Sequence, residues 1–222
     1  MQEPDPLLAA DDLVTAPSPL DGPLQTSVAA QGLPLFPLRS VLFPGGVLGL
    51  TVTDPVFHTL LSRCMATGQA FGAICLRDVE PRKLERVGVA AIVTDLAAAG
   101  QGWRARCVGQ RRFRILAKPP KGDDGVRVAA VQYLDDDAHV APQPAQFPVV
   151  QALSKALATL RERGQNSVVE PLRWDDAGWV ANRWCELLPI PLEARQRLME
   201  LSDPQSRLAI VDTFLRDKKV IG

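Results

Sequence analysis

The sequence is poor in the residues that mark most specialised protein classes. It has four cysteines, no two spaced as a CxxC pair, which argues against a structural zinc site. Lys plus Arg and Asp plus Glu are balanced at 25 each, so no net charge draws the chain to nucleic acid or to an anionic membrane. No apolar run approaches the roughly 18 residues of a membrane span, and the N-terminus lacks the cationic start of a signal peptide. We predict a cytoplasmic protein with reduced, mostly buried cysteines and no metal or other cofactor.

Catalytic motifs are equally scarce. There is no G-x-x-x-x-G-K-[ST] phosphate loop, and the only histidines are His58 and His139. His58 and Cys64 are six residues apart on a predicted helix, which turns them about 120° away from each other. A nucleophile pair needs hydrogen-bond reach, so these residues favour a protein without a catalytic site. A small Cys/His hydrolase stays open as an alternative.

Acidic clusters are present, but their spacing is not that of a cation site. Asp135, Asp136 and Asp137 follow a predicted strand, and Asp123 and Asp124 lie in a nearby turn. Several carboxylates could hold a divalent cation, yet no EF-hand spacing occurs. We interpret both clusters as solvated loops.

The composition changes three times along the chain. Residues 1–32 form an acidic, Pro-rich tail, since residues 1–31 carry a charge of −5 with no Lys or Arg. Residues 33–134 have the period-2 patterns and turn signals of short strands, with one helix between Asp54 and Gly68. Residues 135–148 are a polar linker, and residues 149–222 have helical periodicity. This order predicts an α+β protein: a mainly antiparallel sheet that curls into a barrel, followed by a helical bundle.

The stretch LPLFPLRSVLFPGG contains the same pattern twice: an apolar pair followed by a proline. A proline removes a donor from the strand ladder, so we expect each copy to pair on one side only. We therefore predict an edge strand and a crossing chain, whose apolar residues plug the core. These residues are Leu35, Phe36, Leu42 and Phe43.

The same stretch resembles the opening signature of the Lon substrate-binding (N-terminal) domain family. Further motifs follow in the family's order: TVTDPVFHTLL, RVGVAAI, VGQRRFRI and, near the end, QRLME. The resemblance covers about residues 33–215. One departure is Asp54-Pro55-Val56-Phe57, where the family usually has Glu-Pro-Arg-Tyr. Another is that the ATPase and Ser-Lys peptidase of full-length Lon proteases have no counterpart in this sequence, so the resemblance predicts a stand-alone binding domain.

The resemblance implies a PUA-like, LON-type barrel that binds polypeptide without catalysis. The expected partners are exposed segments of other proteins, and in addition a protease or a chaperone. We expect the segment to lie in the groove between the halves, with strand addition at the proline-limited edge as a second mode. The predicted contact residues are Phe36, Arg39, Phe43, Phe57, Trp103 and Trp174.

An RNA-binding module is the second alternative. Five arginines crowd residues 103–114, and barrels similar to this family's, such as the PUA fold, sometimes bind RNA. Alternation, however, puts Arg104 and Arg106 on one outward face, as any soluble hairpin requires. The neutral overall charge also makes a nucleic-acid partner the weaker interpretation.

Overall fold

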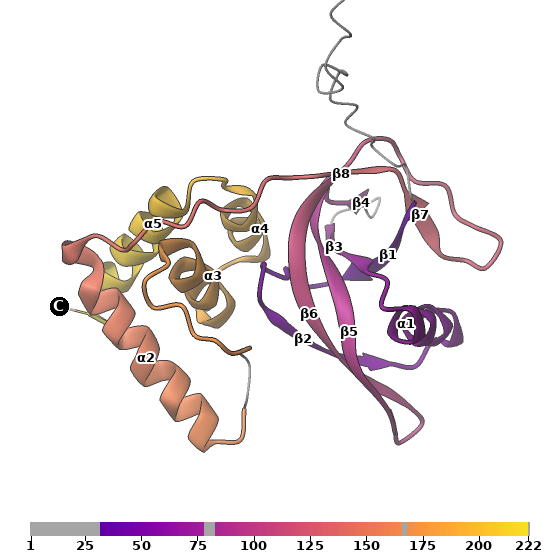
Figure 1. The fold of residues 1–222 in the computed structure, drawn as a ribbon, viewed down its shortest axis with the longest axis horizontal. Coiled ribbons are helices and arrows are strands. Elements are labelled where there is room, and N and C mark those ends of the chain that lie inside the picture. Colours follow the sequence, from indigo (N-terminus) through magenta and orange to yellow (C-terminus); the bar gives the residue numbers. More distant parts are fainter. Residues whose placement is uncertain (1–31, 78–82, 166–167, 222) are drawn as a thin grey trace, which may run out of the picture.

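The computed structural model describes residues 32–77, 83–165 and 168–221, so the predicted tail lies almost wholly outside the described residues. The strands are β1 (Leu33–Leu38), β2 (Val47–Val52), β3 (Phe71–Arg77), β4 (Lys83–Leu84), β5 (Val87–Ala99), β6 (Gly102–Ile115), β7 (Arg127–Ala129) and β8 (Val131–Tyr133). The helices are α1 (Pro55–Thr67), the short η1 (Pro144–Gln146), α2 (Phe147–Glu162), α3 (Ala177–Leu187), α4 (Leu192–Glu200) and α5 (Pro204–Asp217). Figure 1 shows the sheet with α1 on one side of the molecule and α2 to α5 on the other. The chain is therefore a mixed α+β protein, as predicted.

The described strands form one sheet that is antiparallel except at one ladder. Its main path runs β2-β6-β5-β3-β1-β7, with β4 paired to β3 and β8 paired to β6. Only the β1–β3 pair is parallel among these ladders. The path begins at β2 and ends at β7, so the described sheet is open and its ladders do not close it into the predicted barrel.

The first proline-stopped segment is not the edge strand that was predicted. β1 pairs with β7 through residues 33–35 and with β3 through residues 35–38. Pro34 precedes the β3 ladder and Pro37 lies beyond the β7 ladder, so each missing N–H falls where one neighbouring strand is absent. The prediction was wrong because β1 forms two short ladders, one on each side, that overlap only at Leu35. Each proline lies outside one of these ladders, so its missing N–H group is not needed on that side.

The longest strand, β6, contains the arginine-rich residues 103–114. β6 runs through Gly109 for 14 residues without a break, and its hairpin with β5 shifts register between Val89 and Ala91 and between Val93 and Asp95. Such irregularities bend a long hairpin without ending it. The short strands β7 and β8 follow β6 and pair with β1 and β6, respectively.

The helix predicted between Asp54 and Gly68 is confirmed. Asp54 caps α1 by accepting from Val56 N at 2.9 Å, and Gly68 ends the helix with φ 69°. Asp203 caps α5 ahead of a proline in the same way. Asp176 caps α3 by accepting from Trp179 N at 3.1 Å. Among the described residues, no helix has the length and apolar character needed to cross a membrane.

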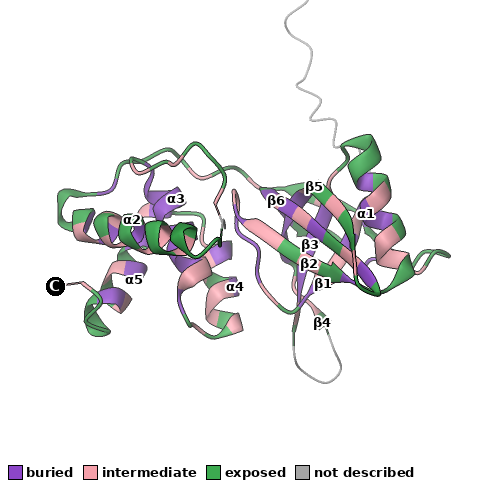
Figure 2. Ribbon diagram, turned by 90° about the horizontal axis from the view of Figure 1, so that it is seen from below, coloured by how far each residue is buried: buried purple, intermediate pink, exposed green. Residues whose placement is uncertain are grey.

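Two hydrophobic clusters hold the structure together. The larger one joins both halves and includes most of α3, whose buried residues stand out in Figure 2. It contains Trp184, whose Nε1 donates to Val149 O at 3.1 Å. The smaller cluster belongs to the sheet alone and is wholly apolar: Leu33, Leu35, Ile74, Ala90, Phe113, Ile115 and Ala129.

Candidate functional site

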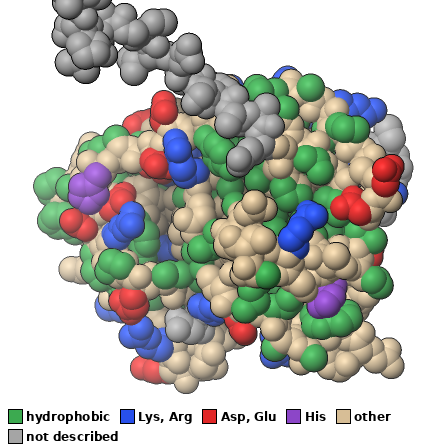
Figure 3. All heavy atoms as spheres, turned by 45° about the vertical axis from the view of Figure 1, so that its right-hand side comes forward, with side chains coloured by type: hydrophobic (Ala, Val, Ile, Leu, Met, Phe, Trp, Pro, Cys, Tyr) green, Lys and Arg blue, Asp and Glu red, His purple; other side chains and the backbone are tan. Residues whose placement is uncertain are grey.

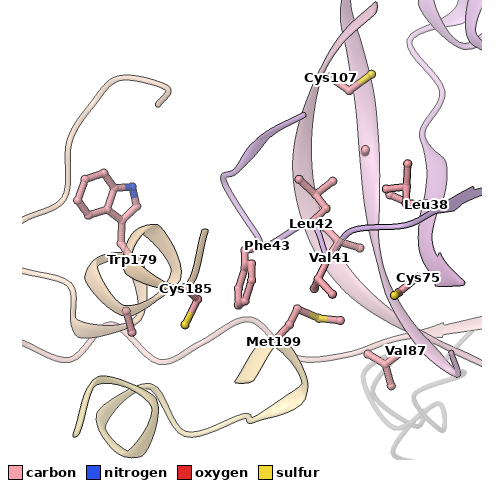
Figure 4. Close-up of a cluster of buried hydrophobic side chains, with 14 of the residues drawn as sticks. Leu38, Val41, Leu42, Phe43, Cys75, Val87, Cys107, Trp179, Cys185 and Met199 are labelled. Atoms are coloured by element: carbon pink, nitrogen blue, oxygen red, sulfur yellow. The ribbon is translucent and has the colours of Figure 1, made fainter. Parts of the chain in front are cut away.

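The sheet meets the helices through residues 39–46, which we call the crossing segment because they connect β1 to β2. Val41, Leu42 and Phe43 of this segment are buried. Figure 4 shows the Phe43 ring between the sheet and the helices, near Cys185 of α3 and Met199 of α4. We call the surface where the sheet and the crossing segment meet α3, α4 and α5 the junction.

Arg183 of α3 fixes the crossing segment. Its side chain is 1% exposed, and its guanidinium donates to Gly45 O at 2.5 Å and to Pro44 O at 2.9 Å. The same group bonds Glu186 Oε1 at 3.0 Å. Arg183 thus supplies hydrogen-bond donors to the carbonyl groups of Pro44 and Gly45, which lie outside any strand.

Close approach at the junction requires two glycines. A Cβ on Gly46 would overlap Glu186 Oε1, and a Cβ on Gly109 would overlap the carbonyl oxygen of Phe43. Gly109 also exchanges backbone hydrogen bonds with the segment: its carbonyl oxygen accepts from Gly45 N and its N–H donates to Gly46 O, at 2.9 Å each. The glycine of the VGQRRF motif therefore lets the crossing segment lie directly on β6.

A network of charged side chains fills another part of the junction. Asp137 accepts from Arg112 of β6 at 2.6 Å and from Arg207 of α5 at 2.6 Å. Arg112 also donates to Leu201 O at 3.0 Å, and Arg207 donates to Asn182 Oδ1 at 3.0 Å. Both arginines are buried. Asp137, predicted to lie in a solvated loop, instead joins the two halves as an ion-pair hub.

Glu186 is a carboxyl group at the junction that is bonded to Arg183, with its side chain 22% exposed. Burial raises its pKa from 4.5 to about 7, against the opposing charges of Arg183 and Arg195. Its neighbour Gly46 leaves no room between this carboxyl and the crossing segment. Near neutral pH this group therefore exists in both protonation states.

Two clefts border the crossing segment. The charged cleft has a volume of about 370 Å³ and combines apolar side chains with groups of both signs. It is lined by Pro44, Gly45, Val108, Gly109, Gln110, Arg111, Arg112, Asp136, Asp137, Val169, Glu170, Pro171, Arg173, Asp176, Trp179 and Asn182. The apolar cleft is smaller, about 230 Å³, and is lined by Ser40, Val41, Leu42, Val47, Leu48, Leu157, Val168, Arg183, Glu186, Leu187 and Arg195. The junction is thus packed at its centre and open at two places on its border.

A third cavity, of about 740 Å³, lies away from the junction near the ends of β1, β3 and β6. Apolar residues such as Pro37, Leu84 and Ile115 line it, with Lys83 and Arg127 among its charged residues. Sequence reasoning gave no sign of this cavity, since strands distant along the chain form it.

The six predicted contact residues do not share one surface. Phe43 is fully buried, so its prediction as a contact residue is corrected: the ring is a core residue that joins the halves. Arg39 is exposed at the start of the crossing segment. The Phe36 and Phe57 rings pack on each other at 4.6 Å, and Phe36 also contacts Phe71 at 5.9 Å.

The two predicted tryptophans lie in different halves of the molecule. Trp103 stacks on His58 of α1 at 3.7 Å, on the sheet side. Trp174 meets Trp179 edge-on at 5.1 Å, on the helical side, and lines a cleft of about 290 Å³. Trp179 lines the charged cleft, so Trp174 lies beside the junction through its contact with Trp179.

The geometry does not favour the hydrolase alternative. Cys64 is 3% exposed, and burial raises the pKa of its thiol. His58 Nε2 lies 3.2 Å from Ser62 Oγ, and its ring is covered by Trp103. The observations that suggested a nucleophile pair are therefore explained by packing.

The arginines of residues 103–114 are divided among different environments. Arg112 is buried in the junction, whereas Arg111 is exposed and pairs with Asp136 at 3.4 Å. Figure 3 shows cationic and anionic side chains interspersed on the face that it presents. No group of three or more His, Cys, Asp and Glu side chains that could hold a metal ion is found among the residues that the structure describes.

The comparison with protein families decides the identity. Residues 32–217 match the family model described as the ATP-dependent protease La (LON) substrate-binding domain. The chain belongs to the LON substrate-binding domain family. The resemblance seen in the motifs is thereby confirmed, and its residues can be assigned a structural role: LFPG crosses the junction, and VGQRRF supports it.

Named relatives of this LON domain are Lon proteases. "Lon protease 2" of Herpetosiphon aurantiacus is 26% identical over 193 residues, which are 82% of this chain and 23% of the relative. "Lon protease 2" of Myxococcus xanthus is 26% identical over 223 residues, which are 96% of this chain and 27% of the relative. The chain therefore spans about a quarter of the length of these relatives.

Solved structures agree with the LON fold. The crystal structure of a Lon N-terminal domain protein from Xanthomonas campestris matches with a TM-score of 0.66 and 28% identity, over 82% of this chain and 97% of that one. The N-terminal domain of a Mycobacterium avium complex Lon protease matches with a TM-score of 0.58 and 18% identity, over 84% and 99% of the two chains. The second likeness concerns the fold alone.

Proposed function

We propose that this LON domain is a non-catalytic module that binds segments of other polypeptides at the junction and supplies them to a protease. Membership of the substrate-binding family carries the proposal. The two clefts beside the crossing segment support it, because they offer apolar and charged groups at a place where two rigid halves meet. A cytoplasmic location and a chaperone partner stay predictions of the sequence, and an RNA-binding module stays the weaker alternative.

The charged cleft is the main binding surface in this proposal. Val108, Pro171 and Trp179 give it apolar contacts, while Arg111, Gln110 and Glu170 can pair with the backbone or the side chains of an extended chain. Trp174 extends the surface toward the neighbouring cleft through its contact with Trp179. Tryptophan beside a cleft is a common anchor of protein interfaces.

Strand addition has a better candidate than β1. β2 is the six-residue strand at one end of the sheet path, and Gly46 O faces β6. By alternation, the backbone groups of Gly49 and Thr51 face the opposite edge. We propose this edge, in place of the proline-limited one, as the second binding mode.

The test uses two valines of similar exposure. Val169 lies in the charged cleft and is 38% exposed, whereas Val140 lies outside the clefts and is 36% exposed. Val169→Asp should weaken binding of a fluorescein-labelled, permanently unfolded polypeptide at least about fivefold, because it places a charge where an apolar contact forms. Val140→Asp should leave the anisotropy titration unchanged. Binding that is absent in the unmodified chain, or equal in both variants, contradicts the proposal.

A further inference from the structure

The cavity near the ends of β1, β3 and β6, which we call the sheet cavity, offers apolar surface that a ligand can cover. Its volume of about 740 Å³ falls within the range of about 300–1,000 Å³ that is typical of ligand sites. Leu76, Leu84 and Leu116 are among its lining residues, and Leu116 is 51% exposed although its side chain is large and apolar. An exposed leucine beside other apolar lining residues indicates an interaction site.

The charges of the sheet cavity favour an anionic ligand. The described residues that line it include four cations and one carboxylate: Lys83, Arg86, Lys118 and Arg127, with Glu85. Glu85 already pairs with Arg77, outside the lining, at 3.2 Å. Arg127 is partly buried and donates to Pro119 O at 3.0 Å. The other three cations are exposed and belong to none of the ion pairs of the described residues, so they are accessible to carboxylates.

The first 31 residues of the chain contain a segment of matching chemistry. They carry a charge of −5 and no Lys or Arg. Residues 5–14, which we call the tail segment, combine three acidic residues with four large apolar ones: Asp5, Asp11, Asp12, Leu7, Leu8, Leu13 and Val14. Residues 15–31 contain a single acidic residue, Asp21. The tail segment is therefore the part of the tail that matches the sheet cavity in both charge and apolar character.

The described chain begins close enough to the sheet cavity for this segment to reach it. Leu33 starts β1, and Pro37 of the same strand lines the cavity, four residues or about 13 Å further along. The tail segment is separated from Gly32 by the 17 residues 15–31. A flexible linker of that length has an end-to-end distance of about 23 Å. The tether thus spans the distance and presents the segment at an effective concentration on the order of millimolar.

We propose that the sheet cavity binds the tail segment of its own chain, with the segment's leucines on Leu84 and Leu116 and its carboxylates beside the three exposed cations. This inference does not depend on the proposed function, because the sheet cavity lies away from the junction and shares no lining residue with its two clefts. The bound segment covers apolar surface of the sheet and leaves the junction open to other polypeptides.

Paramagnetic relaxation in the full chain tests the contact. Ala9→Cys adds one reactive thiol to the tail segment for a nitroxide label, since all four native cysteines are buried. We expect the amide signals of Leu84 and Leu116 to lose most of their intensity and that of Ile210 on α5 to keep it. Ile210 is the matched reference because it is 49% exposed. No loss at Leu84 and Leu116, or an equal loss at Ile210, overturns the inference.

A mixed sample distinguishes the possible sources of the segment. It contains the isotope-labelled chain without a nitroxide and the nitroxide-labelled chain without isotope. A contact within one chain causes no loss of signal in this mixture. Loss at Leu84 and Leu116 in the dilute mixture would mean that a second copy supplies the segment, and it would refute binding within one chain. Loss at Val169 of the charged cleft in place of Leu116 would refute the assignment to the sheet cavity.

Charge reversal tests the cationic residues of the cavity. Lys83→Glu combined with Lys118→Glu should weaken the intramolecular binding constant at least about fivefold, because two attractive pairs are replaced by repulsion. Lys155→Glu, an exposed lysine of α2, is the matched control and should leave it unchanged. Adding Asp11→Lys and Asp12→Lys to the double variant should restore the loss of signal at Leu116. A weakened contact that these tail changes do not restore contradicts the proposed pairing.

The apolar part of the contact is tested in the tail alone. Leu7→Ser combined with Leu8→Ser should weaken the intramolecular binding constant at least about tenfold, because two leucine side chains lose their apolar burial. Leu20→Ser combined with Leu24→Ser changes the same residue types outside the tail segment and should have little effect. Equal effects of the two pairs overturn the choice of residues 5–14. All four positions lie outside the described fold, and an unchanged melting temperature confirms that the fold is intact.

Discussion

The sheet core and the junction are both buried, but they are built from different chemistry. The sheet core is wholly apolar and joins strands that already share ladders. The junction joins the sheet to helices with few backbone bonds between them, and it buries Arg112, Arg183 and Arg207. Apolar packing accepts many side chains of similar volume, whereas a buried guanidinium needs its acceptors in fixed places. The strand ladders thus form the sheet, whereas the buried arginines determine how the helices pack against it.

The largest expected effect comes from removing the shared carboxylate of the junction. Asp137→Ala would leave Arg112 and Arg207 buried without their ion-pair partner, so we expect a loss of about 3–5 kcal/mol in the free energy of unfolding. Chemical denaturation measures it. Asp136→Ala is the matched control, because its side chain is 73% exposed and should cost no more than about 1 kcal/mol. A similar, small loss of stability in both variants would contradict the role of the buried arginines in joining the helices to the sheet.

A smaller effect is expected where the crossing segment lies on β6. Gly109→Ala would push its Cβ against the carbonyl oxygen of Phe43, and we expect a loss of about 1–3 kcal/mol. Gly49→Ala has open space around the added methyl group, so it should stay within about 0.5 kcal/mol of the unmodified protein. Thermal melts of the two variants make the comparison. If Gly109→Ala and Gly49→Ala have the same melting temperature, the close approach of the crossing segment to β6 does not stabilise the junction.

The pH dependence of stability should carry the signature of Glu186. The folded state keeps the Glu186 proton up to a pKa of about 7, whereas the unfolded state releases it near 4.5. The folded state binds more protons between these values, so this group's contribution to stability falls as the pH rises through that window and is constant above it. Glu186→Gln should remove that part of the slope and stabilise the protein by about 1–2 kcal/mol at pH 8. Urea titrations from pH 5 to 8 measure the slope.

The exposed Glu193 provides the control for this titration. Glu193→Gln should leave the pH profile parallel to that of the unmodified protein. A Glu186→Gln profile that is also parallel would show that the junction does not hold a neutral carboxyl group.

The smallest effect concerns the order in which the two regions open. All four cysteines are buried, and burial raises the pKa of Cys107 and Cys185 to about 12, so alkylation should be slow in the folded protein. Cys107 belongs to the sheet and Cys185 to the junction. Because the junction has few ladder bonds, we expect Cys185 to be labelled at lower urea than Cys107, as followed by mass spectrometry of peptides. Simultaneous labelling would mean that the two regions unfold as one unit.

The sequence was sufficient for elements that local chemistry decides. The cap at Asp54, the proline that follows it and Gly68 define α1, and the motifs identified the family. It was insufficient wherever partners lie far apart. In the sequence, Arg112 cannot be distinguished from the surface arginines near it, because its partners Asp137 and Leu201 follow 25 and 89 residues later. The sequence does not decide whether Phe43 is a contact residue or a core residue. An apolar ring beside a turn fits both roles, and only the position of the helices distinguishes them.

The chain passes between the two halves only once in the described structure, through residues 134–143 between β8 and η1. Residues 138–141 of this connection are exposed, whereas the contacts that join the halves come from the crossing segment and the buried arginines. A protease that cuts within residues 138–141 would sever the only covalent tie and leave those contacts in place. The two fragments should then elute together from a sizing column and, after separation, restore each other's fold on mixing.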